Sequence, residues 1–148
     1  MRIDSHQHFW KRELGYYNWL TEDMGAIYRD FSADDLRPLL KKSGIDRTVL
    51  VQAAPDIAET KYMLSLAETT DFIAGVVGWV DMQSIDAPYH LANLSRSPYF
   101  KGIRPMIQDI NDDEWMLKEE LSTEFFTLMQ LGLCGLLSTS DAADDRLR

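Results

Sequence analysis

Four alternations of a short β-rich run with an amphipathic helical run limit the possible folds of this chain more than any other feature. The β-rich runs are expected at residues 2–9, 48–52, 72–80 and 101–106, and the helical runs at 32–43, from 56 onward, at 88–95 and at 122–131. The third β-rich run is almost wholly apolar, which is typical of a parallel strand covered on both faces. Four successive βα units predict an α/β fold with a parallel sheet, either doubly wound or part of a (βα)8 barrel.

Capping residues indicate where the first two helices begin and end. Ser32 with Asp35 three residues later predicts a capping box, and Gly44 predicts the end of that helix. Asp56 with Glu59 predicts a second capping box. One face of the second helix is then expected to carry Ala58, Tyr62 and Leu66. The aromatic-rich segment 10–28 has no clear period and is expected to be a long loop.

Composition and charge exclude several classes of function. The formal net charge is -9, and no stripe of Lys or Arg interrupts this acidity, so nucleic acid is not expected as a partner. No apolar stretch is close in length to the ~20 residues that a membrane helix needs. The N-terminus does not resemble a secretory signal. Cys134 is the single cysteine and excludes an internal disulfide. It is expected to be a buried apolar residue. A soluble, cytoplasmic chain without nucleic-acid or membrane partners is therefore expected. The strands lack the glycine patterns that bind nucleotides, which disfavours a nucleotide-binding sheet.

The strongest local signal for chemistry is the pair of histidines in the first β-rich run. Asp4, His6 and His8 are two residues apart and are expected on one side of a strand. Two imidazoles at the carboxyl end of a strand bind one metal ion readily, at ~2.0–2.1 Å for zinc, when other strands supply the remaining ligands. The alternative is that the two rings only fill the mouth of a barrel with hydrogen bonds.

Four sequence stretches in order carry a family resemblance: IDSHQHFW, TVLVQAAPDIAET, FIAGVVGWVDM and KGIRPMIQD. Together they resemble the metal-dependent TIM-barrel hydrolases of the amidohydrolase superfamily, in the amidohydrolase-related branch that includes sugar lactonases such as L-fuconolactonase and L-rhamnonolactonase. The resemblance extends over residues 2–134. It implies a (βα)8 barrel, of which this chain carries about the first four βα units as a half barrel.

The resemblance also implies two alternative roles for His6 and His8. In most of the superfamily such a pair ligates a divalent metal ion, with zinc the first choice here. The ion lowers the pKa of bound water and polarises the substrate carbonyl. Some similar members of the lactonase branch work without a metal, and there the pair would hydrogen-bond the substrate directly. In both cases His6 and His8 are the candidate catalytic residues.

Three further residues are candidates for substrate binding. Arg104 matches the position where the lactonase branch places an arginine that faces the substrate, and its guanidinium suits a carboxylate or a polarised carbonyl. A surface ion pair is the alternative for this residue. Gln52 ends the second β-rich run and either lines the pocket or only packs. Trp10, together with Trp19, is expected either to form an apolar wall over a sugar ring or to serve packing alone. His90, on a predicted helix, is expected at the surface or in packing.

The sequence no longer resembles the family after residue 137. Residues 1–137 are expected to form the N-terminal half of the barrel. Residues 138–148 are expected to form an irregular polar tail, produced by truncation or a frame shift of the reading frame. A complete barrel takes about 250 residues. An open half barrel exposes inward side chains and two sheet edges, so a marginal monomer that forms a homodimer through these edges, or aggregates, is expected.

Two classes of function follow from these observations. The first is a hydrolase that opens a sugar lactone or a related cyclic ester with activated water, with a small-molecule substrate as its partner. The second is a truncated, catalytically inactive barrel fragment that retains at most ligand or metal binding. A related TatD-like nuclease also begins with His-X-His, but the acidic surface and the fourth-strand motif disfavour it.

Overall fold

The computed structural model describes residues 1–136 and contains one parallel sheet. Its five strands lie side by side in the order β1-β2-β3-β4-β5, which is also their order in the sequence. The strands are β1 (Ile3–Gln7), β2 (Arg47–Val51), β3 (Ile73–Gly78), β4 (Phe100–Ile103) and β5 (Cys134–Gly135). All four neighbouring pairs are parallel, as the βα alternation predicts.

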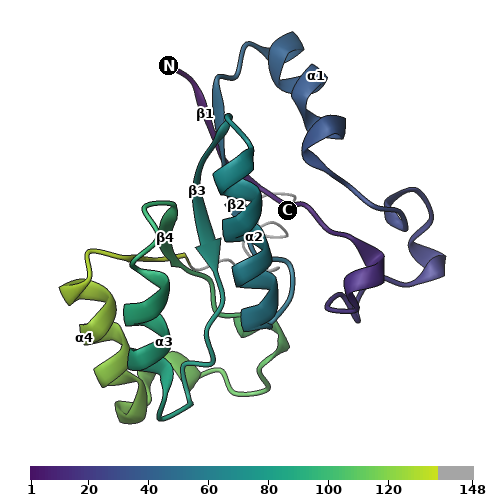
Figure 1. Cartoon of the computed structure of the whole chain (residues 1–148). Helices are drawn as coiled ribbons and strands as arrows, with labels where there is room; N and C mark the ends of the chain where they lie inside the picture. Colours follow the sequence, from purple (N-terminus) through teal and green to yellow (C-terminus); the bar gives the residue numbers. More distant parts are fainter. Residues whose placement is uncertain (137–148) are drawn as a thin grey trace, which may run out of the picture.

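Helices connect consecutive strands, and short 3-10 turns occur in the longer connections. The α-helices are α1 (Ala33–Ser43), α2 (Ile57–Thr69), α3 (Ala87–Leu94) and α4 (Ser122–Gln130). Figure 1 shows α2 lying along the sheet, where it packs on β3, and α3 beside α4. The 3-10 turns are η1 (Arg12–Leu14), η2 (Glu22–Ile27), η3 (Ile107–Asp109), η4 (Trp115–Leu117) and η5 (Glu119–Leu121). The bounds predicted from the sequence differ from these by a few residues at most.

The sheet curls as one half of a (βα)8 barrel. The Gln52 side-chain amide, which follows β2, donates a hydrogen bond of 2.9 Å to the carbonyl oxygen of Arg104, which follows β4. This contact spans β3, which lies between the two strands in the sheet. Residues of alternate strands come together on the inner side of a barrel, because the curvature of the sheet brings them past the strand between them. The half-barrel fold predicted from the sequence is therefore confirmed, and a doubly wound sheet is excluded.

A main hydrophobic core joins the sheet to its helices. It is built from apolar residues of the strands and of the helix faces that cover them, including Leu50, Val76, Ile103, Met63 and Leu91. A second, smaller cluster lies over the carboxyl ends of the strands and consists of Tyr17, Leu20, Ala53 and Ala54, with tryptophans and tyrosines around it. Segment 10–28 is therefore not a bare loop: it contains η1 and η2 and packs on the end of β2.

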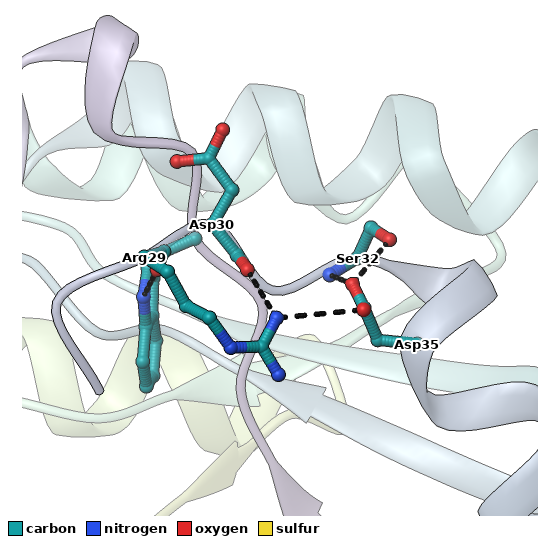
Figure 2. Close-up of polar contacts among 5 residues, drawn as sticks. Arg29, Asp30, Ser32 and Asp35 are labelled. Carbon is teal, nitrogen blue, oxygen red and sulfur yellow. Dashed lines mark hydrogen bonds and ion pairs between the residues drawn. The ribbon is translucent and has the colours of Figure 1, made fainter. Parts of the chain in front are cut away.

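The start of α1 confirms the capping box predicted there. The Asp35 carboxylate accepts hydrogen bonds from the backbone N–H of Ser32 (2.9 Å) and from its hydroxyl (2.7 Å), as Figure 2 shows. In the same view the Arg29 guanidinium bridges the carbonyl oxygen of Asp30 and the carboxylate of Asp35. These contacts attach the end of the first long connection to α1. Gly44 ends the helix in the left-handed conformation, at φ 64°.

The first turn of α2 corrects one sequence prediction. Asp56 is the N-cap and accepts from the N–H of Ala58, as expected. Glu59 does not complete a capping box, because its carboxylate reaches back past the helix start to the preceding loop. The face that enters the core carries Glu59, Thr60, Met63, Leu64 and Ala67. The residues expected to share one face, Ala58, Tyr62 and Leu66, are partly buried.

The described chain ends in β5. Cys134 lies in this strand and is exposed, so the expectation that it is a buried apolar residue is wrong. The polar tail predicted for residues 138–148 lies outside the described residues. Within residues 1–136, no helix is both long and apolar enough to cross a membrane.

Candidate active site

The two histidines predicted as the catalytic pair face each other at the carboxyl end of β1. Their Nε2 atoms are 3.2 Å apart, and the rings meet edge to face with centroids separated by 4.9 Å. The register of β1 against β2 is irregular between Asp4 and Gln7, just where the pair begins. The Asp4 carboxylate accepts from the backbone N–H of His6 at 3.1 Å. Asp4 therefore supports the backbone of the pair.

A backbone contact fixes the proton on His8. The Nδ1 of His8 lies 2.8 Å from the carbonyl oxygen of Val51, at the end of β2. A carbonyl oxygen only accepts hydrogen bonds, so Nδ1 carries the hydrogen and Nε2 keeps its lone pair. Metal-binding histidines are oriented by the same kind of outer contact. The neutral ring of His8 thus presents a basic nitrogen toward His6.

Burial and charge keep both imidazoles neutral. Burial is the main cause that lowers the pKa of His6 and of His8 from the ordinary value of 6.5. The positive charge of Arg104 lowers both further, whereas Asp4 raises the pKa of His6 and the Val51 carbonyl raises that of His8. At neutral pH the pair is therefore uncharged, which is the protonation state that binds a metal ion.

The separation of the pair fits two ligands of one metal ion. Two nitrogen ligands at ~2.0–2.1 Å with a tetrahedral angle between them lie about 3.3–3.4 Å apart, close to the 3.2 Å found here. The residues present therefore fit zinc as two of its ligands. Within residues 1–136 no group of three or more His, Cys, Asp or Glu side chains is placed to hold a metal. The described residues thus supply two of the usual four ligands.

Arg104 and Gln52 hold each other at the ends of β4 and β2. Besides the bond from the Gln52 amide to Arg104, the Arg104 Nη1 lies 3.5 Å from the carbonyl oxygen of Gln52. Gln52 is fully buried, and its amide nitrogen holds the Arg104 backbone, while its Oε1 has no partner among the described atoms. Arg104 forms no ion pair with the described carboxylates. Its buried Nε has no hydrogen-bond partner among the described atoms either.

A cavity of about 380 Å³ lies beside the histidine pair and unites three of the predicted residues. His8, Trp10 and Arg104 all line it, as does Trp19. The two tryptophan rings meet edge to face at 5.4 Å, and the Trp10 Nε1 donates to the Arg29 carbonyl at 2.7 Å. Both tryptophans therefore form a wall of this cavity, with their polar atoms turned to the backbone.

Sequence reasoning missed the remaining lining residues. They are Ala53, which follows β2, and Met106, Gln108 and Asp109, which follow β4. Gln108 and Asp109 lie in η3, where no periodic pattern singles them out. The available signal was their position: loops after barrel strands carry the site, and these residues belong to the loop after β4.

Trp79 and Asp81, which follow the end of β3, lie outside this cavity, and so does His90. Trp79 and Asp81 line a second, smaller cavity of about 210 Å³ between the ends of β3 and β4. The two cavities have Met106 and Asp109 in common. His90 lies on α3 with its ring against Tyr89, which confirms a role at the surface or in packing.

Fold and site together define the class of protein. Enzymes of the (βα)8 class place their catalytic groups at the carboxyl ends of the barrel strands, and His8, Gln52 and Arg104 all follow the ends of parallel strands here. Residues 3–130 match the family model described as Amidohydrolase. The chain therefore belongs to the amidohydrolase family.

Two curated relatives are similar over most of the chain. An L-fucono-1,5-lactonase of Burkholderia ambifaria is 52% identical over 115 residues, which cover 78% of this chain and 40% of the relative. An L-fucono-1,5-lactonase of Burkholderia multivorans is 37% identical over 112 residues, which cover 76% of this chain and 38% of the relative. The chain thus spans about two fifths of the length of these relatives.

Solved structures of amidohydrolases have the same fold as this chain. Two crystal structures of an amidohydrolase from Burkholderia multivorans superpose on this chain with a TM-score of 0.84 at 31% identity. The match covers 93% of this chain and 48% or 49% of the solved chains. One of those structures contains bound HEPES and the other bound zinc. The half barrel described above corresponds to about half of those proteins.

Proposed function

We propose that this chain carries one half of a hydrolase site for a sugar lactone or a related cyclic ester. The observation that carries the proposal is the neutral His6–His8 pair, with Nε2 atoms 3.2 Å apart, next to a cavity lined by Arg104 and two tryptophans. The similarity to two L-fucono-1,5-lactonases supports the substrate class.

His6 and His8 would hold a divalent metal ion, with zinc favoured by their separation and by the zinc in the similar solved structure. When bound, the ion supplies a Lewis acid that polarises a carbonyl and lowers the pKa of a water molecule. The Val51 carbonyl keeps the His8 lone pair directed toward the site. In a metal-free reaction only a ring nitrogen that carries a hydrogen could donate to the substrate carbonyl. Because the His8 Nε2 keeps its lone pair, that donor would be His6.

The cavity would orient the substrate through its polar and apolar walls. Arg104 lines the cavity and offers guanidinium donors to a lactone oxygen or a carboxylate. Trp10 and Trp19 offer an apolar surface on which a sugar ring packs. Gln52 acts through Arg104, because its amide holds the Arg104 backbone and its side chain is fully buried.

The second candidate function is a catalytically inactive half barrel that retains ligand or metal binding. It is favoured by one observation: residues 1–136 place only two histidines together as metal ligands. Incubation of the purified 148-residue chain with L-fucono-1,5-lactone, followed by titration of the acid released, separates the two functions. Turnover that is lost in His8→Ala supports the hydrolase. No turnover at any zinc concentration supports the inactive half barrel.

Zinc binding by the histidine pair is predicted for either function. Replacing His8 with alanine removes one of two neutral nitrogen ligands, so the affinity for zinc is expected to fall at least about tenfold. Isothermal titration of the purified chain with zinc measures this change. His90→Ala is the matched control, because His90 lies on α3 away from the pair, and it should bind zinc like the parent chain. Equal affinities of His8→Ala and the parent would contradict the assignment.

The open edges of the sheet support a second copy of the chain as partner. β1 and β5 each have only one neighbouring strand in the described sheet, so each offers unpaired backbone groups. Ile3 on β1 is also 46% exposed, although it is a large apolar residue on a strand. Pairing of two copies through these edges would cover both features.

A further inference from the structure

Glu59 is a buried carboxylate for which the proposed chemistry has no use. It lies in the first turn of α2 and is fully buried. No Lys or Arg among the described residues forms an ion pair with it. A buried charge without a cation is costly, so the hydrogen bonds that it receives have to offset much of that cost.

Those hydrogen bonds come from the loop between β2 and α2. The Glu59 Oε2 accepts from the backbone N–H of Ala54 at 2.9 Å and from that of Ala53 at 3.2 Å, while Oε1 lies 3.1 Å from the Ala53 nitrogen. The carboxylate therefore fixes two consecutive peptide units just past the end of β2. Glu59 does not serve the amino terminus of its own helix, which Asp56 caps.

The same peptide units hold the tryptophan wall of the cavity. The Trp19 Nε1 donates a hydrogen bond of 2.7 Å to the carbonyl oxygen of Ala53. Trp19 in turn contacts Trp10 edge to face, and both rings line the cavity together with Ala53 itself. A continuous chain of contacts thus runs from Glu59 through Ala53 to Trp19 and Trp10.

We infer that Glu59 is a positioning residue of the site: its carboxylate fixes the Ala53–Ala54 peptide units and, through them, the orientation of Trp19 against the cavity. Glu59 touches no substrate in this role. The inference rests on the proposed function only for the use of the cavity, because the orientation of Trp19 is measurable without turnover.

Protonation of Glu59 offers a means of testing this role. Burial raises the pKa of Glu59 to about 7, against the lowering effect of its bonds to Ala53 and Ala54. The Tyr17 hydroxyl, from the loop after β1, lies beside the carboxylate without completing a hydrogen bond, and Asp56 adds a like charge from the start of α2. Burial raises the pKa of Tyr17 well above its usual range, so this hydroxyl stays neutral.

The ionised form of Glu59 is expected to hold the loop more firmly than the protonated form. A carboxylate is acceptor-only, and hydrogen bonds to it are about twice as strong as those to a neutral group. The bonds to Ala53 and Ala54 should therefore weaken as the pH falls through the region near 7. The environment of Trp19 should follow, because its anchor is the Ala53 carbonyl.

The experiment labels the chain with 5-fluorotryptophan and follows the four tryptophan resonances by fluorine NMR between pH 5 and 9. Trp19→Phe assigns the Trp19 resonance. The wild-type Trp19 resonance is expected to shift with a midpoint near pH 7, and Glu59→Gln is expected to remove that transition. In Glu59→Gln, amide hydrogen exchange at Ala53 and Ala54 should be faster by about tenfold or more at pH 8.

Matched variants separate positioning from general stability. Glu124→Gln changes another buried carboxylate, on α4, and should leave the Trp19 transition and the exchange at Ala53 and Ala54 unchanged. Trp19→Phe removes only the far end of the contact chain and should leave that exchange slow. Glu59→Gln retains one acceptor oxygen, so it should preserve more protection than Glu59→Ala.

Three outcomes would overturn the inference. The first is an unchanged Trp19 transition in Glu59→Gln, and the second is an equal response of both readouts to Glu59→Gln and Glu124→Gln. The third applies if Glu59→Gln does not fold. Amide exchange in the wild-type chain then decides, and exchange at Ala53 and Ala54 as fast as that of unprotected amides at pH 8 contradicts the role. None of these measurements depends on lactone turnover. A failure of the proposed function can therefore be distinguished from a failure of the role inferred for Glu59.

Discussion

At the scale of single residues, the site depends on which nitrogen of each imidazole carries a proton. The Val51 carbonyl assigns the His8 hydrogen to Nδ1, and burial keeps the ring neutral. Arg104 adds a positive charge at the other side of the cavity, which further disfavours protonation of His6 and His8. The guanidinium thus helps to keep both imidazoles in the neutral form that binds a metal ion, besides its proposed role as a donor to the substrate.

Removing the charge of Arg104 should raise the pKa of both histidines. In Arg104→Gln the repulsion between the guanidinium and the imidazolium is lost, so each pKa is expected to move up toward the ordinary value of 6.5, with burial still acting against protonation. Titration of the histidine ring protons by NMR measures the change. Arg104→Lys keeps the charge and should leave both pKa values nearly in place. A pKa that falls in Arg104→Gln would contradict the electrostatic account.

The candidate residues that the sequence could predict share one property. His6, His8 and Arg104 follow or end β-rich runs, where a barrel places its site, and their side chains carry recognisable chemistry. The wall formed by Trp10 and Trp19 depends on how a long irregular loop folds back over β2, which no period reveals. Gln52 meets the expectation of packing: it is fully buried beneath Arg104.

At the scale of elements, α2 shows why local patterns mislead at a functional edge. Glu59 stands three residues after Asp56, as in a capping box, and a helix considered alone would use it so. The loop before the helix carries N–H groups that no strand or helix satisfies, and the carboxylate bonds to them instead. The helix accordingly turns Glu59 and Thr60 into the core. The competing partners come from tertiary structure, which the sequence pattern does not contain.

The pairing of β4 with β5 makes a prediction at the same scale. Gly102 pairs with Cys134, and a Cβ on Gly102 would overlap the Cys134 carbonyl oxygen. Because backbone cannot move aside as a flexible side chain does, Gly102→Ala should separate the strands and lower the free energy of unfolding by about 1–3 kcal/mol. Denaturation by urea measures this loss.

The matched control is in the partner strand. A Cβ on Gly135 would meet no atom of residues 1–136 within 4 Å, so Gly135→Ala should leave stability within about 0.5 kcal/mol of the parent chain. Amide exchange in β5 should be faster only in the Gly102 variant. An equal effect of the two substitutions would show that close approach at Gly102 does not limit the pairing of the strands.

At the scale of the whole molecule, the sheet is curved but open. The alternation of βα units predicts a parallel sheet, yet it suits a doubly wound sheet as well as a barrel. The contact between Gln52 and Arg104 across β3 decides for the barrel, and it depends on the curvature of the sheet. The described strands leave the outer sides of β1 and β5 without a neighbour.

The 148-residue chain is therefore expected to associate through these edges. Unpaired backbone groups on an edge strand template pairing with another chain, and a charged side chain on the edge opposes it. Sedimentation of the purified chain should show a dimer or larger species. Ile3→Lys places a charge on β1 and should shift the chain toward monomer, whereas Ile85→Lys, at a position 95% exposed outside the sheet, should not. A monomer at all concentrations, or the same response to both lysines, would show that the edges of the sheet do not drive association.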